Sequence, residues 1–271
     1  MNNILIAFIL MLSISLVACV ALTLVSRFFG IEEDPKKKEV RECLPGINCG
    51  ACGFKGCDDY AEALAQQQAK PNLCVPGAKK VIKKISKILG VAAEEFNDVV
   101  AFVSCNGTCD ATNKKSEYDG VSSCKAVSAL YGGTGECVYG CLGLGDCAKV
   151  CPAGAICTID GIARIDSKKC LGCGLCVGTC PKHIISMVPQ HTTTVVVCSN
   201  KQKGADARKA CKNACIGCKK CEKVCNFGAI TVNNNLASVD QKKCTHCGEC
   251  AKQCPTGCLK FLTLPNMEEV E

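Results

Sequence analysis

The sequence contains no tryptophan, and only 4% of its 271 residues are aromatic. Large aromatic side chains supply much of the buried surface of an ordinary core, so little of this chain can form a large one. The sequence instead contains 29 cysteines. Metal sites or disulfides must therefore hold the fold together, and secreted disulfide scaffolds are usually much shorter than this chain.

Motifs for nucleotide chemistry are also absent. No glycine-rich dinucleotide fingerprint follows an expected strand, and the sequence contains no P-loop. The histidines, His183, His191 and His246, have no spacing typical of a metal site or of acid–base catalysis. His246 lies inside a cysteine run, where we expect it to tune a metal site rather than to bind the metal. The sequence therefore predicts no catalytic substrate site in this chain.

One cysteine pattern occurs twice in the chain, with the second copy 74 residues after the first. The Gly-Ala-Ile segment at 154–156 recurs at 228–230, and the proline at 181 recurs at 255. A repeat of this kind indicates two tandem modules. The paired cysteines are Cys124 and Cys198, Cys137 and Cys211, Cys141 and Cys215, Cys147 and Cys221, Cys151 and Cys225, Cys170 and Cys244, Cys173 and Cys247, Cys176 and Cys250, and Cys180 and Cys254.

The second copy contains two C-x2-C-x2-C-x3-C runs, the spacing with which bacterial ferredoxins bind two 4Fe-4S clusters. Three closely spaced thiolates bind one cluster, and the fourth cysteine of each run binds the other cluster. Zinc is the weaker alternative, because it needs four ligands per site and no double run. The expected ligands are Cys215, Cys218, Cys221 and Cys254 for one cluster, and Cys225, Cys244, Cys247 and Cys250 for the other.

The first copy lacks one ligand, because Leu144 stands where the repeat has Cys218. Cys141, Cys147 and Cys180 remain, so this site either holds a 3Fe-4S cluster or takes a ligand from elsewhere. We favour Cys137 as that ligand, with Cys157 as the alternative. The other site of this copy is complete, and its expected ligands are Cys151, Cys170, Cys173 and Cys176.

A glycine-rich loop nearer the N-terminus contains another set of cysteines. Its expected ligands for a 4Fe-4S cluster are Cys49, Cys52, Cys57 and Cys74. Glycines let backbone amides approach inorganic sulfur, and structural zinc is the alternative. The apolar spacing over 58–70 predicts a helix that ends before Pro71. The stretch 75–89 predicts a basic amphipathic helix that ends at Gly90, either as a solvated face or as a docking edge for an acidic donor or anionic lipid.

The N-terminal stretch from Ile4 to Val25 is apolar and long enough to span a bilayer as a helix. A cleavable lipoprotein signal ending near Cys19 is the alternative, but no positive residue precedes the run. Positive residues follow it instead, so the positive-inside rule predicts that the rest of the chain faces the cytoplasm. That compartment is reducing and disfavours disulfides.

Taken together, the patterns predict a small α/β (α+β) protein that binds five 4Fe-4S clusters. A looser group of cysteines, with Cys105, Cys109, Cys124 and Cys137, leaves open either a sixth cluster or packed free thiols. Cys19, Cys43 and Cys258 are expected to bind nothing. The predicted parts are a transmembrane anchor at 1–30, a four-cysteine 4Fe-4S domain at 31–91, a cysteine-containing connector at 92–134, ferredoxin-like modules at 135–189 and 190–262, and a tail at 263–271.

The glycine-rich loop also carries a resemblance. Residues 44–57, LPGINCGACGFKGC, are followed by DYAEA at 59–63. Together with the apolar N-terminus and the ferredoxin runs, they resemble the B subunit of the Rnf complex, a family that includes the Rsx electron-transfer complex. The resemblance implies a membrane-anchored electron-relay subunit. It would take electrons from reduced ferredoxin and pass them to partner subunits that reduce NAD and pump Na+ or H+.

Two other function classes stay open at this point. One is the iron-sulfur subunit of a different membrane oxidoreductase, such as a hydrogenase or a quinone-linked enzyme. The other is a zinc-binding interaction protein. A nucleic-acid partner is not indicated, because the basic stretches contain no interleaved aromatic residues and no binding motif.

Overall fold

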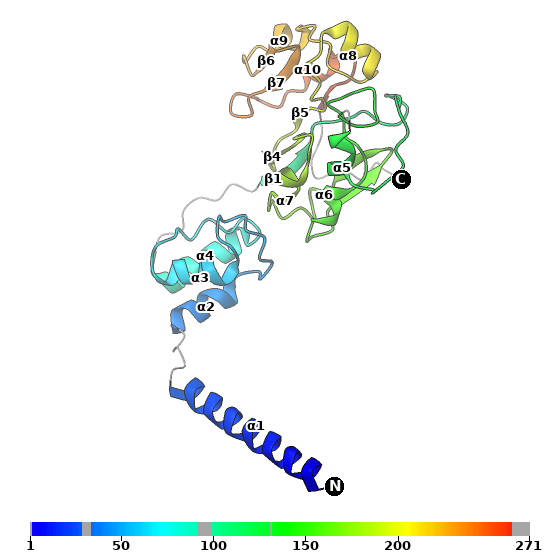
Figure 1. The fold of residues 1–271 in the computed structure, drawn as a ribbon. Helices are drawn as coiled ribbons and strands as arrows, with labels where there is room; N and C mark the ends of the chain where they lie inside the picture. The colour runs from blue at the N-terminus through cyan, green and yellow to red at the C-terminus, as the bar shows by residue number, and fades with distance from the viewer. Residues whose placement is uncertain (1, 29–33, 92–98, 131, 262–271) are drawn as a thin grey trace.

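The computed structural model describes residues 2–28, 34–91, 99–130 and 132–261. The predicted tail at 263–271 lies outside these residues, as do 92–98 of the predicted connector. Figure 1 shows a long helix, a small helical domain and a cysteine-rich part built of short helices and strands. The long helix is α1, Asn2–Phe28. Its stretch Ile4–Val25 is apolar and long enough to cross a membrane.

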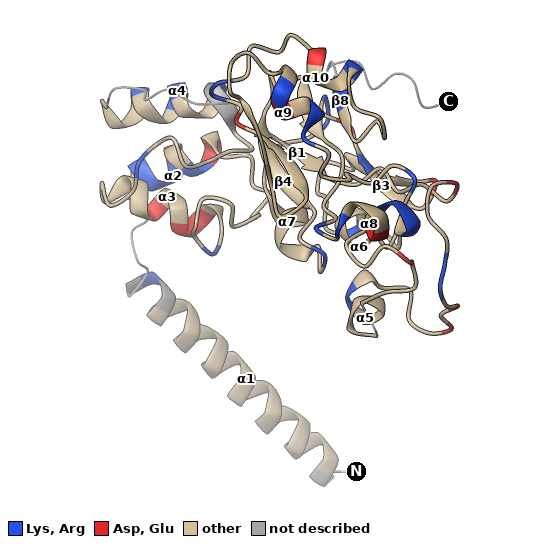
Figure 2. Ribbon diagram, turned by 90° about the horizontal axis from the view of Figure 1, so that it is seen from above, with Lys and Arg blue, Asp and Glu red and all other residues tan. Residues whose placement is uncertain are grey.

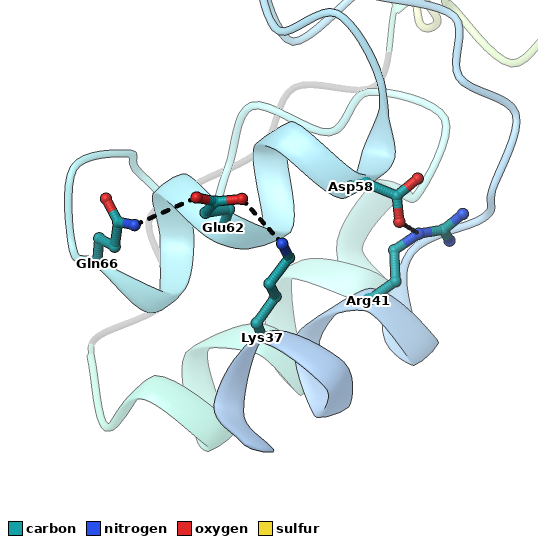
Figure 3. Close-up of polar contacts among 5 residues, drawn as sticks. All are labelled: Lys37, Arg41, Asp58, Glu62 and Gln66. Carbon is teal, nitrogen blue, oxygen red and sulfur yellow. Dashed lines mark hydrogen bonds and ion pairs between the residues drawn. The ribbon is translucent and has the colours of Figure 1, made fainter. Parts of the chain in front are cut away.

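The helical domain, residues 34–91, packs three helices together. They are α2 (Pro35–Cys43), α3 (Cys57–Ala65) and α4 (Ala78–Leu89). Their buried core contains Val40, Tyr60, Leu64 and Ile85. On the surface, ion pairs join α2 to α3, at 2.8 Å for Lys37 with Glu62 and 2.6 Å for Arg41 with Asp58 (Figure 3).

Helix α3 is shorter than the sequence predicts, since it ends at Ala65 rather than at residue 70. Gln67 has a φ of 58°, the left-handed conformation that terminates a helix. The amide of Gln68 then donates to the carbonyl of Ala63 at 2.8 Å, which closes the helix end. The next residues fold back instead, and the Tyr60 hydroxyl donates to the carbonyl of Lys70 at 2.6 Å.

Two modules of matching topology follow the helical domain. The first contains β1 (Val99–Val103), α5 (Cys124–Ala129), α6 (Asp146–Lys149), β2 (Ile156–Ile159), β3 (Ile162–Ile165), α7 (Leu175–Thr179) and β4 (Ile185–Pro189). The second contains β5 (Thr194–Val196), α8 (Gly204–Ala210), α9 (Lys220–Val224), β6 (Ile230–Asn233), β7 (Leu236–Val239), α10 (Glu249–Lys252) and β8 (Leu259–Phe261). Strands β2 and β3 correspond to β6 and β7 under the 74-residue shift, so the sequence repeat is also a structural repeat.

Each module contains two antiparallel two-stranded sheets. In the first module β2 pairs with β3, and β1 pairs with β4, with Val99 opposite Pro189. In the second, β6 pairs with β7, and β5 pairs with β8. Strand β1 lies in the predicted connector, yet it pairs with a strand of the first ferredoxin-like module. The connector therefore contributes to the first module's fold.

The modules bury many cysteines in their cores. In the second module, the buried core is Cys215, Cys221, Ile230, Val232, Ala237, Cys250, Cys258 and Leu259. Half of these residues are cysteines, whereas the core of the helical domain contains mainly aliphatic and aromatic side chains. The two regions therefore depend on different sources of stability.

The packed core of the helical domain predicts that truncating a buried side chain lowers the stability of this domain. Leu64 is fully buried, so Leu64→Ala is expected to lower the free energy of unfolding of this domain by about 2–5 kcal/mol. The measurement is the urea dependence of amide hydrogen exchange in α2, α3 and α4 of the full chain. Gln68→Ala is the control because its side chain is exposed, and a change below about 0.5 kcal/mol is expected. Equal effects of the two variants would contradict the assignment of this core.

Candidate metal centres

The second module places four predicted ligands around one cavity, which we call site 2A. The cavity encloses about 310 Å³. Its ligand candidates are Cys215, Cys218, Cys221 and Cys254. These residues lie in the loop before α9, at α9 itself and in the segment after α10, as the ferredoxin pattern predicts.

A fifth cysteine also lines site 2A. Cys258 was expected to bind nothing, but it is buried beside the cavity, with its Sγ 3.6 Å from that of Cys254. The hydrogen bond between the two sulfurs lowers the pKa of Cys254 to about 4. The hydrogen bonds to Cys215 and Cys254 raise the pKa of Cys258 in turn. In the folded chain, Cys258 therefore stabilises the thiolate form of Cys254.

The second set in this module, site 2B, contains Cys225, Cys244, Cys247 and Cys250. Burial raises the pKa of Cys250, and the nearby thiols of Cys244, Cys247 and Cys225 raise it further. Cys225 belongs to the first run of this copy and the other three belong to the second run. Cys225 therefore lies near the cysteines of the second run, as the predicted crossover requires, and the crossover of ligands stays a prediction.

In the first module, site 1B contains all four cysteines that were expected there. They line a cavity of about 330 Å³, and they are Cys151, Cys170, Cys173 and Cys176. Backbone amides point at their sulfurs. The amide of Ala155 donates to Cys151 at 3.4 Å, and the amide of Ala101 on β1 donates to Cys170 at 3.5 Å.

Site 1A differs from the prediction in one ligand. Its cavity encloses about 400 Å³ and is lined by Cys124, Cys141, Cys147 and Cys180. Neither Cys137 nor Cys157 lines it. Cys157 is exposed on β2, and Cys137 lies at another cavity. Cys124 is thus the fourth cysteine that lines site 1A, where the repeat has Leu144 in place of a cysteine.

The first turn of α5 fixes the position of Cys124. Next to it, the Ser123 hydroxyl and the Lys125 amide both donate to the carboxylate of Asp146 on α6, at 2.8 and 3.1 Å. Burial opposes ionisation of Asp146, but these donors and Lys149 hold the pKa of that carboxyl below its ordinary value. Because α6 also carries Cys147, the carboxylate ties the two cysteines to one another.

The glycine-rich loop and α3 form the loop site. Its members are Cys49, Cys52, Cys57 and Cys74; burial raises the pKa of Cys74, and the other three thiols raise it further. The side-chain oxygen of Asn48 accepts a hydrogen bond from the amide of Cys57 at 2.8 Å, which holds the loop against α3. Gly50 and Gly53 have φ values of 70° and 87°, which glycine adopts without strain. Cys43 packs against the core of this domain instead.

The electrostatics of these sites favour a positively charged occupant. Burial raises the pKa of Cys74 to about 11, that of Cys147 to about 11 and that of Cys176 to about 12, and neighbouring thiols add to each shift. Four thiolates cannot share a buried space unless positive charge compensates them. Iron would supply this charge, and the amides directed at the sulfurs supply hydrogen bonds.

Three of the cysteine sets line hollows that are partly open to solvent, with about 310–400 Å³ of space at sites 1A, 1B and 2A. Within the described residues, no group of three or more His, Cys, Asp or Glu side chains is close enough to hold one metal ion. The donor type and the paired runs are those of iron-sulfur sites.

The loop site lies close to site 1B. Burial raises the pKa of Cys173 first, and Cys49 of the loop site raises it further through its charge. A Cβ added to Gly172 would lie 3.0 Å from the side chain of Val75, the residue after Cys74. The helical domain and the first module therefore meet where their cysteine sets are located.

Models of three protein families match segments that contain these sites. An Fe-S cluster model matches residues 44–76, which include the loop site. The LdpA Fe-S cluster-binding domain matches residues 145–191, which include site 1B and part of site 1A. The 4Fe-4S dicluster domain matches residues 214–258, which include sites 2A and 2B.

The chain is also similar to named proteins along most of its length. The B subunit of the proton-translocating ferredoxin:NAD(+) oxidoreductase complex of Clostridium ljungdahlii is 42% identical over 266 residues, 97% of this chain and 94% of that protein. The B subunit of the Na(+)-translocating complex of Acetobacterium woodii is 39% identical over 241 residues, 89% of this chain and 72% of that protein. The B subunit of an ion-translocating oxidoreductase complex of Methanosarcina acetivorans is 40% identical over 237 residues, 87% and 90% of the two chains.

Proposed function

The chain belongs to the B subunits of the ion-translocating ferredoxin:NAD(+) oxidoreductase, or Rnf, complex, and we propose that its cysteine sets carry electrons from reduced ferredoxin to partner subunits. The partner subunits then reduce NAD and move Na+ or H+. The observation that carries this proposal is that predicted ligands line common cavities at sites 1B and 2A, and that three of them do so at site 1A.

The residues of each site have distinct roles in this proposal. Cysteine sulfurs bind iron, and the buried aliphatic side chains around them, such as Ile156 and Ile230, exclude water. Backbone amides, such as those of Ala155 and Ala163, donate to the sulfurs and stabilise negative charge there. A bound 4Fe-4S cluster supplies storage and transfer of one electron at a time. Hydride chemistry and ion movement are assigned to partner subunits.

Helix α1 is the proposed membrane anchor, and it agrees with membership in an ion-translocating complex. Arg27 and the basic residues of α2 follow the apolar stretch, so we place the iron-sulfur domains on the cytoplasmic side. The similar proteins named for Na+ and for protons match this chain almost equally well, so the proposal covers either ion.

The second module is the proposed docking face for ferredoxin. Cys218 of site 2A and Cys247 of site 2B are exposed, so a donor can approach both sites closely. Lys219 and Lys220 line site 2A, and Lys223 lies exposed on the same helix. Figure 2 shows basic residues on α8 and α9 of this module. Such a surface attracts an acidic electron carrier and speeds its association.

Charge reversal on α9 tests this proposal. Lys220→Glu together with Lys223→Glu is expected to slow reduction of the chain by reduced ferredoxin by about tenfold or more at low salt, because steering is lost. The measurement is stopped-flow bleaching of the visible absorbance of anaerobically purified protein. Reduction by dithionite, a small molecule, is expected to stay unchanged in extent.

The matched control places the same charges on α4. Lys83 and Lys87 are exposed there, and Lys83→Glu with Lys87→Glu is expected to leave the rate with ferredoxin nearly unchanged. If the α4 variant slows reduction more than the α9 variant does, the docking face for ferredoxin lies on the helical domain instead. A colourless, iron-free preparation of the parent protein would refute the electron-relay role itself.

A further inference from the structure

A fourth cavity lies between the two modules and is lined by four cysteines that belong to none of the sites described above. It encloses about 500 Å³ and is partly open to solvent. Its cysteines are Cys105, Cys137, Cys198 and Cys211. They come from four separate segments: the chain after β1, the loop before Cys141, the chain after β5, and the end of α8. Cys105 and Cys211 are buried, and the other two are half-buried.

The four sulfurs face a common space. Cys137 acts electrostatically on each of Cys105, Cys198 and Cys211. A Cβ built on Gly107 would lie 3.6 Å from the sulfurs of both Cys105 and Cys211, so these two sulfurs lie close to the same glycine. Sites 1A and 1B likewise have four cysteines around one cavity.

The hydrogen bonds to these sulfurs resemble those at the ferredoxin-type sites. At sites 1A and 1B, backbone amides donate to cysteine sulfurs, as Ala163 does to Cys141 and Ala155 does to Cys151, both at 3.4 Å. Backbone amides also donate to two of the four cysteines between the modules. The donors there are Gly107 to Cys105 and Asn200 to Cys198, both at 3.4 Å.

The sulfur of Cys137 has a donor from a buried side chain. Asn200 is 1% exposed, and its Nδ2 donates to the sulfur of Cys137 at 3.6 Å. Its orientation is fixed because its Oδ1 accepts from the amide of Gln202 at 2.8 Å. The sulfurs of Cys105, Cys137 and Cys198 therefore have N–H donors, which would stabilise thiolate charge with iron bound.

Hydrogen bonds between the modules hold the cavity in shape. The Thr112 hydroxyl donates to the carbonyl of Ala210 at 2.7 Å, beside Cys211. The Ser199 hydroxyl, next to Cys198, donates to the carbonyl of Ser104 at 2.8 Å, next to Cys105. The segments that carry the four cysteines are thus fixed to one another across the interface.

We propose that Cys105, Cys137, Cys198 and Cys211 bind a further 4Fe-4S cluster, at a bridging site between the modules. This inference rests on the proposed function, in which the flanking cysteine sets also bind clusters. When the cluster is bound, each thiol releases its proton to solvent as its sulfur forms one bond to iron, and no electron is gained or lost.

The bridging site connects sites 1A and 2A. Cys141 of site 1A also lines the bridging cavity, and its amide donates to the sulfur of Cys105 at 3.3 Å. On the other side, the amide of Cys215 of site 2A donates to the sulfur of Cys198 at 3.3 Å. With the contact between the loop site and site 1B, the cysteine sets form one row from the helical domain to the second module.

Metal analysis of the anaerobically purified full chain tests the bridging site. Six 4Fe-4S clusters give about 24 irons per chain and as many acid-labile sulfides, and five give about 20. Cys211→Ser and Cys105→Ser are each expected to lose up to about four irons relative to the parent. The control is Cys157→Ser, because Cys157 is exposed on β2 and lines none of the four cavities, and its iron content is expected to equal that of the parent.

A second variant leaves the four ligands in place. Asn200→Leu removes the N–H donor to Cys137, and it is expected to keep the iron content and to lower the midpoint potential of one cluster. The midpoint potential is expected to fall because the lost hydrogen bond stabilises the reduced cluster, which carries more negative charge. The measurement is an EPR-monitored redox titration, in which the remaining signals are expected to keep their potentials.

The outcomes separate the two proposals. A parent protein with about 20 irons, unchanged iron in Cys211→Ser and unchanged potentials in Asn200→Leu would overturn the bridging site and leave the electron-relay role intact. One zinc per chain that is lost in Cys211→Ser would also overturn it. A parent protein without iron would refute the proposed function itself.

Discussion

Removal of iron is expected to unfold the two modules, residues 99–261, and to leave most of the helical domain, residues 34–91, folded. Each module contains only two-stranded sheets, which are not stable alone in water. Half of the buried core residues of the second module are cysteines, and without iron their sulfurs lose the bonds that hold these loops together. The helical domain instead has Val40, Tyr60, Leu64 and Ile85 in its core, and these residues pack without iron.

The measurement is hydrogen exchange followed by mass spectrometry on the full chain, before and after iron is chelated under anaerobic, reducing conditions. Peptides from β2, β3, β6 and β7 are expected to lose nearly all protection, whereas peptides from α2, α3 and α4 keep most of it. The control is Cys74→Ala with iron present, in which the modules are expected to stay protected. Modules that remain protected without iron would contradict the role of the clusters in folding.

The repeated elements were predictable because their signals are local. Strands β2 and β3 recur as β6 and β7 at equivalent positions, and the crossover from Cys225 to Cys244, Cys247 and Cys250 follows from the spacing of two runs. The backbone repeats as well. Gly172 and His246 occupy equivalent positions, and both have left-handed φ values, of 66° and 58°. His246 thus stands at a turn position.

Ligands that come from distant segments were harder to predict. Cys124 reaches site 1A because Asp146 ties α5 to α6, and this contact has no spacing signature in the sequence. The bridging cysteines come from four segments that meet only after the modules pack together. The one available signal was that Cys198 and Cys211 had partners under the repeat but no run of their own. A pair of cysteines without a local set indicates a site that tertiary structure completes.

Equivalent cysteines of the two modules line different cavities. Cys124 and Cys198 are equivalent under the 74-residue shift, but Cys124 lines site 1A and Cys198 lines the bridging cavity. Site 2A already has a cysteine, Cys218, at the position equivalent to Leu144. Cys124 thus lines the site whose own run has Leu144 in place of a cysteine.

Cys124→Ala is expected to convert site 1A from a 4Fe-4S to a 3Fe-4S cluster. Cys141, Cys147 and Cys180 would remain, and three thiolates bind three irons. The oxidised protein is expected to gain a three-iron EPR signal and to lose about one iron per chain. The parent protein is expected to show no such signal, because Cys124 completes its site. The measurements are EPR of the oxidised protein and iron analysis.

A second substitution provides the rescue. Leu144→Cys in the Cys124→Ala background is expected to abolish the three-iron signal and to restore the lost iron. The loop is already shaped for this ligand, because Gly143 has a φ of 70° where Gly217, beside Cys218, has 65°, and Gly145 has 77° where Lys219 has 59°. A cysteine at 144 would thus start from the backbone conformation that directs Cys218 into site 2A.

The comparison with Cys137 decides between the two ligands. If Cys124 completes site 1A, Cys137→Ala leaves that site with four ligands, because Cys137 lies at the bridging cavity. Any three-iron signal of Cys137→Ala would then persist when Leu144→Cys is added. If Cys137 completes site 1A, as the sequence alone favours, Cys137→Ala gives the three-iron signal that Leu144→Cys removes. Cys124→Ala then gives no such signal. A three-iron signal in the parent protein would refute both assignments, since site 1A would then have only three ligands.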